Sequence, residues 1–128
     1  MSKKQREPEI RPVFQWLDDV ADHDFDAAEA YLSMKFDVAE VEQLVHGLRD
    51  AKLTTRRAND ILRACGKDPL PIEDPGVLHN LLKVARGEKM SPVLVVNHGV
   101  QSDIADGFHR VSLVYQLDPF GLVPLRIA

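Results

Sequence analysis

The stretch ADGFHR, residues 105–110, brings together residue types that can hold an anion. Asp106 can end a strand and accept hydrogen bonds from the N–H groups of a following helix. His109 and Arg110 then fall in the first turn of that helix, where the backbone already carries positive partial charge. A bound phosphate would make this placement favourable. We therefore expect a phosphate-binding turn formed by Gly107, Phe108, His109 and Arg110.

A purely structural role is the alternative for the same residues. Asp106 could simply cap the helix or pair with Arg110 four residues on, and His109 could be a solvated surface residue. Asp103 and Asp106 are expected to share one face of the preceding strand, where two carboxylates near a phosphate could hold Mg²⁺. Alternatively, Asp106 could serve as the catalytic base of a nuclease. If the protein is an enzyme, we expect a nucleoside triphosphatase or a nuclease-like phosphohydrolase.

Other motifs of catalysis or metal binding are weak in this sequence. The histidines of the second half lack metal-ligand spacing, so no zinc site is expected. There is no Walker loop, no dinucleotide fingerprint and no Ser-His-Asp pattern. The single cysteine, Cys65, falls in an apolar helical stripe and is expected to be a small core residue.

A basic stretch between Arg49 and Lys67 is a second candidate for ligand contact. It carries six basic and two acidic residues, with no aromatic residue among them. Such a stretch could steer a nucleotide or a nucleic-acid strand, and a solvated helix face is the alternative. Its arginines on the helix expected over 54–65 are Arg56, Arg57 and Arg63. A weaker basic stripe comprises Lys83, Arg86 and Lys89.

The composition indicates a single domain. The chain has 128 residues, of which 45% are hydrophobic, enough to bury a core. Its net charge of −4 disfavours broad non-specific DNA binding. Residues 1–50 hold six Lys/Arg against twelve Asp/Glu, whereas residues 51–128 hold ten against eight. The charged N-terminus resembles no signal peptide, and the apolar runs are too short to span a membrane, so we expect a cytoplasmic protein.

Apolar spacing and turn residues predict the secondary structure. Helices are expected over residues 10–21, 24–32, 38–48 and 54–65. Asp24 or Asp26 would cap the second, and Asp37 the third, with Glu40 as capping-box partner. The proline-rich connection 67–76 leads to a helix that starts at Asp74-Pro75. Strands at 92–96 and 100–105, a helix at 107–117 and a final strand at 122–128 follow, the last at a sheet edge because of Pro124.

These elements predict an α+β fold with an α-helical N-terminal extension. The order from the proline-rich connection onward is helix, strand, hairpin, strand, helix, strand. The expected divisions are a disordered tail over 1–8, the helical extension over 9–66, the connection over 67–76 and the core over 77–128.

The segment from about Gly76 to Ala128 resembles the ParB/sulfiredoxin-like superfamily. It carries ARGEKMSPVLVV, a short hairpin, IADGFHRVSLVYQL and VPLRIA in the order of that core. In this superfamily a G-x-[HR]-R turn starts a helix and binds nucleotide phosphates, ATP in sulfiredoxins and CTP in ParB-type switches. The resemblance implies that Gly107 is the turn glycine and that His109 and Arg110 face the phosphates of a nucleoside triphosphate with Mg²⁺. The whole chain also resembles small bacterial ParB-like proteins.

Two departures from the family narrow the expected function. Phe108 stands where sulfiredoxins have their reactive cysteine, so sulfinic-acid reduction is not expected. The helix-turn-helix reader of DNA-partitioning ParB proteins does not follow the core in this sequence, so nucleic acid is a less favoured ligand. We expect a protein that binds a nucleotide or another phosphorylated molecule. The alternatives are a non-catalytic module that binds a partner or dimerises through its N-terminal helices, and a metal-dependent nuclease.

Overall fold

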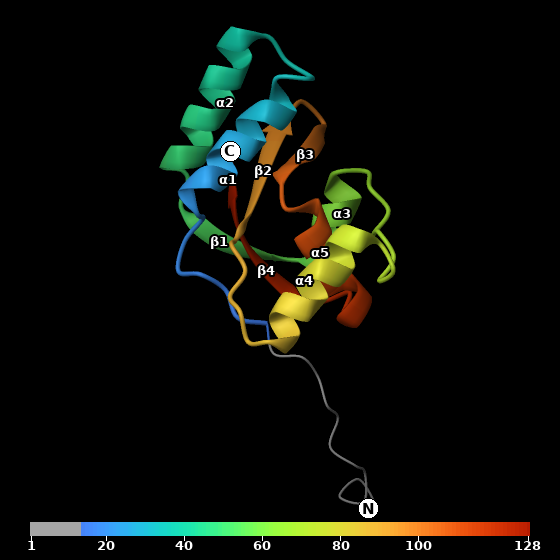
Figure 1. Cartoon of the computed structure of the whole chain (residues 1–128). Helices are drawn as coiled ribbons and strands as arrows, with labels where there is room; N and C mark the ends of the chain where they lie inside the picture. Colours follow the sequence, from blue (N-terminus) through green and yellow to red (C-terminus); the bar gives the residue numbers. More distant parts are fainter. Residues whose placement is uncertain (1–13) are drawn as a thin grey trace, which may run out of the picture.

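The computed structural model describes residues 14–128, which form a mixed α+β fold (Figure 1). In chain order the elements are α1 (Asp22–Leu32), α2 (Val38–Asp50), β1 (Leu53–Arg57), α3 (Ala58–Ala64), α4 (Pro75–Ala85), β2 (Val93–His98), β3 (Gln101–Asp106), α5 (Phe108–Leu117) and β4 (Leu122–Ile127). The predicted α+β class is confirmed, and the segment from α4 to β4 has the predicted order of elements.

The strands form one sheet in the order β1-β4-β2-β3. β1 pairs antiparallel with β4, and β2 pairs antiparallel with β3, whereas β2 and β4 run parallel in the centre. β4 therefore has a neighbour on each side, and the predicted edge position is wrong. Pro124 is tolerated because β4 pairs with β2 only from Leu125 onward, so the proline precedes the part of β4 with strands on both sides.

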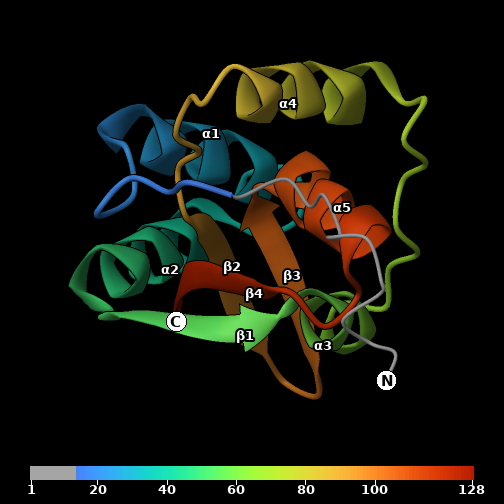
Figure 2. The same ribbon diagram turned by 90° about the horizontal axis from the view of Figure 1, so that it is seen from below.

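Helices cover both faces of the sheet (Figure 2). α1 and α2 bury one face, against Leu94, Val96 and Ala105. α3 and α5 cover the other face, and α4 packs on the outer side of α5 through Val77 and Val84. Because α1 and α2 share a buried cluster with β2 and β3, they belong to the core of the fold and are not an added extension.

Two of the predicted N-terminal helices are wrong in part. Residues 53–57 form β1, and only 58–64 are helical in the segment predicted as one helix. The β-branched Thr54 and Thr55 suit a strand, and pairing with β4 overrides the helical spacing. In the predicted helix over 10–21, the described residues before Asp22 are not helical. Trp16 instead bridges to Met90, and the earlier part, with the predicted tail over 1–8, lies outside the described residues.

The predicted N-terminal caps are present on α2 and α4 but not on α1. Asp37 accepts from the N–H of Glu40 at 2.9 Å, and Asp74 accepts from the first N–H groups of α4, with Pro75 at the first helical position. These two caps are confirmed. The predicted cap at Asp24 or Asp26 is wrong, because α1 begins at Asp22 and Asp24 is buried inside it.

A β-bulge determines where the carboxylates of β3 point. Residues three apart on a strand normally face opposite sides. Here Leu94 faces Asp106 while Val95 faces Ile104, so β3 has one residue more than β2 at this point. The additional residue turns Asp106 toward the side of the sheet that Asp103 faces, the side covered by α1.

Candidate functional site

Arg110 is held by three oxygen acceptors from three parts of the chain. Its Nη2 donates to Asp106 Oδ2 at 2.6 Å, and its Nη1 donates to the carbonyl of Ser91 at 2.8 Å and to Asp24 Oδ2 at 3.2 Å. Only 13% of the side chain is exposed. The guanidinium therefore ties α5 to β3, to α1 and to the segment before β2. The i,i+4 pair with Asp106, the structural alternative above, is present.

Gly107 forms the turn between β3 and α5. Its φ of +112° lies in the left-handed region, and it is the N-cap residue of α5. No side chain caps this helix, because the carboxylate of Asp106 is directed to Arg110. The structure therefore has the predicted strand-turn-helix at this point, but the predicted capping by Asp106 is wrong.

His109 and Phe108 point away from Arg110. The Nε2 of His109 lies 3.5 Å from Asp74 Oδ2 at the start of α4, with about half of the side chain exposed. Its ring occupies the space where a Cβ on Gly76 would lie. Phe108 is partly buried against the core under α3 and α5. The predicted phosphate-binding residues thus do not converge on one point.

A hollow of about 230 Å³ lies beside Arg110, between α1, α4 and the segment that precedes β2. Its polar lining includes Asn80, Lys83, Lys89, Ser91, Asp106 and Arg110. Among residues 14–128, neither Lys83 nor Lys89 takes part in an ion pair. In the sequence these lysines form only a weak basic stripe, since they are six positions apart and their convergence depends on how α4 packs.

The carboxyl of Asp106 is perturbed by its position at this hollow. Burial raises its pKa, and the charge of Asp24 adds to that rise, whereas Arg110 opposes it. Two carboxylates therefore compete for one guanidinium. An anion placed in the hollow would raise the pKa of Asp106 further, and the uncompensated lysines would offset the added negative charge.

Asp103 lies in a separate cluster at the other end of α1. Its side chain is 1% exposed. Lys35 Nζ contacts both carboxylate oxygens, at 3.0 and 2.9 Å, and Tyr31 Oη donates to Oδ1 at 3.0 Å. His98 Nε2 lies 2.5 Å from Oδ2. Protein groups thus surround this carboxylate, and no three metal-ligating side chains come together within residues 14–128.

We expect Asp103→Asn to lower the free energy of unfolding by about 2–3 kcal/mol at pH 7, the value of one charge-assisted hydrogen bond or slightly more. The loss is limited because Lys35 and His98 are 39% and 30% exposed and can reach water. Burial acts to raise the pKa of Asp103, but hydrogen bonds from Lys35, His98 and Tyr31 together hold it below 3.8.

The sign of the pH dependence follows from that lowered pKa. A group with a lowered folded-state pKa stabilises the protein above its unfolded pKa, and the contribution is lost as the pH falls through the folded value. Urea denaturation should therefore show the difference between native protein and Asp103→Asn shrinking below about pH 4. A difference that stays constant down to about pH 2 would contradict this role.

The basic stretch from Arg49 to Lys67 does not form one helix face. Arg56 and Arg57 lie on β1, and the guanidinium of Arg57 lies 5.7 Å from the centre of the Phe120 ring. Arg63, on α3, pairs with Asp60 at 3.3 Å. The expectation of three arginines along one helix is wrong, because this segment changes from strand to helix at Ala58.

Cys65 is buried in the core cluster beneath α3, as expected. Burial raises the pKa of its thiol to about 11, and the charge of Asp103 adds to the rise. The thiol is therefore protonated at neutral pH and is a poor nucleophile.

The fold and the hollow define a mixed α+β protein with a small, positively charged depression beside a buried arginine. No protein-family model, curated protein or solved structure matches the chain. Over residues 14–128, none of the helices combines the length and the apolar character needed to cross a membrane.

Proposed function

We propose that the protein binds a small phosphorylated ligand in the hollow beside Arg110, with a nucleoside triphosphate and Mg²⁺ as the first candidate. The observation that carries the proposal is the pair of lysines, Lys83 and Lys89, which line this hollow without ion-pair partners in the described chain. Together with Arg110 they outnumber the carboxylates of Asp24 and Asp106 there. Such an excess of positive charge favours an anion.

The size of the hollow limits which part of the ligand it would hold. At about 230 Å³ it is smaller than the pockets that enclose whole drug-sized ligands. It suits a phosphate or diphosphate group, and the remainder of a nucleotide would lie outside it. Arg110 would serve as a rigid floor, because three acceptors already fix its guanidinium.

The element order gives a second support. From α4 to β4 it agrees with the order expected from the resemblance to a ParB/sulfiredoxin-like core, with a left-handed glycine between the second strand and its helix. The phosphate position proposed here differs from the family expectation, since His109 is directed to Asp74. The proposal concerns binding and assigns no catalytic residue, because Asp106 is engaged by Arg110.

Calorimetry with ATP, CTP, GTP and pyrophosphate, each with and without Mg²⁺, tests the proposal. We expect Lys83→Gln and Lys89→Gln each to weaken binding about tenfold, because each removes a charge-assisted hydrogen bond. Binding should also weaken as salt is added. Lys52→Gln is the matched control, since Lys52 is exposed and lies outside the hollow.

Variants of Arg110 are unsuitable for this test, because they would also disturb the ion pairs of the core. Two results would contradict the proposal: no binding of any of these phosphates by the native protein, or native affinity in both lysine variants.

A further inference from the structure

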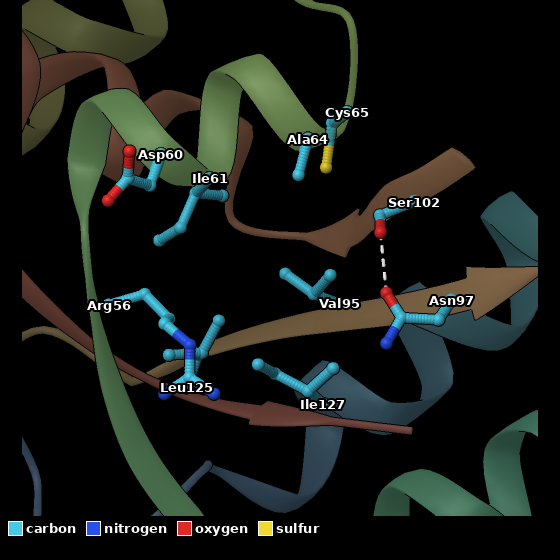
Figure 3. A pocket seen from close by; sticks show the side chains of 10 residues that line it. All are labelled: Arg56, Asp60, Ile61, Ala64, Cys65, Val95, Asn97, Ser102, Leu125 and Ile127. Carbon is cyan, nitrogen blue, oxygen red and sulfur yellow. Dashed lines mark hydrogen bonds between the residues drawn. The ribbon is translucent and has the colours of Figure 1, made fainter. Parts of the chain in front are cut away.

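A second cavity, of about 390 Å³, opens between α3 and the sheet (Figure 3). Its floor consists of Val95 of β2 and of Leu125 and Ile127 of β4. Val95 and Ile127 are paired between the two strands. The wall above it consists of Ile61 and Ala64 of α3 and of Cys65, which directly follows this helix. The cavity shares no lining residue with the hollow beside Arg110.

The cavity exists because α3 is short. The helix has seven residues, and Gly66, with a φ of +62°, turns the chain away directly after Cys65. The helix therefore stops before it covers the end of the sheet at Asn97 and Ser102. The apolar floor on β2 and β4 is therefore left open beside α3, and the volume of the cavity falls in the range of small-molecule pockets.

Arg56 lies at one end of the cavity and carries a charge that no carboxylate neutralises within the described chain. Its Nη1 donates to Thr54 Oγ1 at 3.2 Å and to the carbonyl of Thr55 at 2.8 Å. Asp60 lines the same end, but it pairs with Arg63 at 3.3 Å. This end of the cavity therefore offers a guanidinium to an anion.

Asn97 and Ser102 lie at the opposite end (Figure 3). Ser102 Oγ donates to Asn97 Oδ1 at 2.5 Å, which leaves the amide N–H groups of Asn97 as donors. Cys65 on the wall stays protonated at neutral pH, since burial raises the pKa of its thiol to about 11. The interior between the two ends is apolar and unreactive.

We infer that this cavity binds a small amphipathic carboxylic acid. The hydrocarbon chain lies on Val95, Leu125 and Ile127, and the carboxylate pairs with Arg56, the cation at the rim. The apolar floor supplies most of the affinity, and Arg56 selects an acid over an alcohol of the same length. The inference does not depend on the proposed phosphate site.

Calorimetry on the full chain with butanoate, hexanoate, octanoate and 1-octanol tests this inference. Affinity should rise about threefold to fourfold for each added methylene, the gain expected for burying that group. Octanoate should bind about twofold to fivefold more tightly than 1-octanol, the value of one ion pair to an exposed arginine.

Two variants and one control separate the parts of the site. Ala64→Phe should fill the cavity and abolish octanoate binding, and Ala64 is exposed on α3, so the fold should persist, as circular dichroism would verify. Arg56→Gln should reduce octanoate affinity about twofold to fivefold and leave 1-octanol affinity unchanged. Arg57→Gln, on the neighbouring position of β1, should change neither.

The inference is overturned if the native protein shows no saturable octanoate binding, or if Ala64→Phe binds octanoate as the native protein does. Equal affinities for octanoate and 1-octanol, or an unchanged octanoate affinity in Arg56→Gln, would overturn the assignment of the carboxylate to Arg56.

Discussion

Arg110→Met is expected to lower the free energy of unfolding by about 3–5 kcal/mol, measured by urea denaturation at pH 7. Methionine can fill much of the volume but leaves two carboxylates without their cation. Asp24 is 6% exposed, and Asp106 lies beside it at the end of β3. Removing one partner of a buried ion pair is costly because the remaining charge stays buried and uncompensated.

Arg63→Met is the matched control for this prediction. Like Arg110, Arg63 pairs with an aspartate, in this case Asp60 of the same helix, but the side chain of Arg63 is 78% exposed. The loss of unfolding free energy should therefore stay below about 1 kcal/mol. Adding Asp24→Asn and Asp106→Asn to Arg110→Met should recover part of the loss, because it removes the uncompensated charges. A loss of under about 1 kcal/mol in Arg110→Met itself would contradict a structural role for the ion pairs.

Gly107→Ala should cost about 2–5 kcal/mol, from two additive causes. The left-handed φ of +112° is unfavourable for a residue with a Cβ, by roughly 1–2 kcal/mol. A Cβ would also lie 2.8 Å from Val93 Cγ2 and 3.0 Å from Arg110 Nη2. Val93 is fully buried and Arg110 is fixed by its acceptors, so neither can move aside, and such overpacking costs roughly 1–3 kcal/mol.

Gly99→Ala isolates the backbone part of that cost. Gly99 also has a positive φ, +68°, but nothing lies within 4 Å of the position of its Cβ. We expect a loss of only about 1–2 kcal/mol, so the difference between the two variants measures crowding against Val93. Equal losses in urea denaturation would show that Gly107 is required for its φ alone.

Features that depend on neighbouring residues could be predicted from the sequence. The cap at Asp37, the start of α4 at Asp74-Pro75 and the turn at Gly107 each need only a few adjacent residues. The pair of Asp106 and Arg110 is also of this kind, since the two residues are four positions apart and belong to the structural alternative predicted for this turn.

Features that depend on distant pairing could not be predicted. β1 is a strand because β4, about 70 residues later, pairs along its whole length. Arg110 meets Asp24 across 86 residues, and no spacing in the sequence reveals that contact. The same holds for Lys83 and Lys89, whose position at the hollow depends on the packing of α4 against α5.

The apolar residues of α4 show that apolar spacing can predict a helix without determining which of its faces is buried. Leu78 and Leu82 follow the helical spacing of apolar residues, but they are 41% and 51% exposed. The buried stripe follows Val77 and Val84, with Leu81 partly buried between them. Apolar residues fill two overlapping stripes of this helix, and only the shape of the neighbouring α5 selects one.

The strand order has a consequence for synthesis of the chain on the ribosome. Within residues 14–128, β1 has only β4 as a neighbour in the sheet, and β4 follows β1, β2 and β3 in the chain. Until it emerges, β1 has no partner, and β2 with β3 forms a lone hairpin, which is marginally stable in water. The sheet can therefore be completed only after β4 has been synthesised, and shorter nascent chains leave strand edges unpaired, a state that favours aggregation.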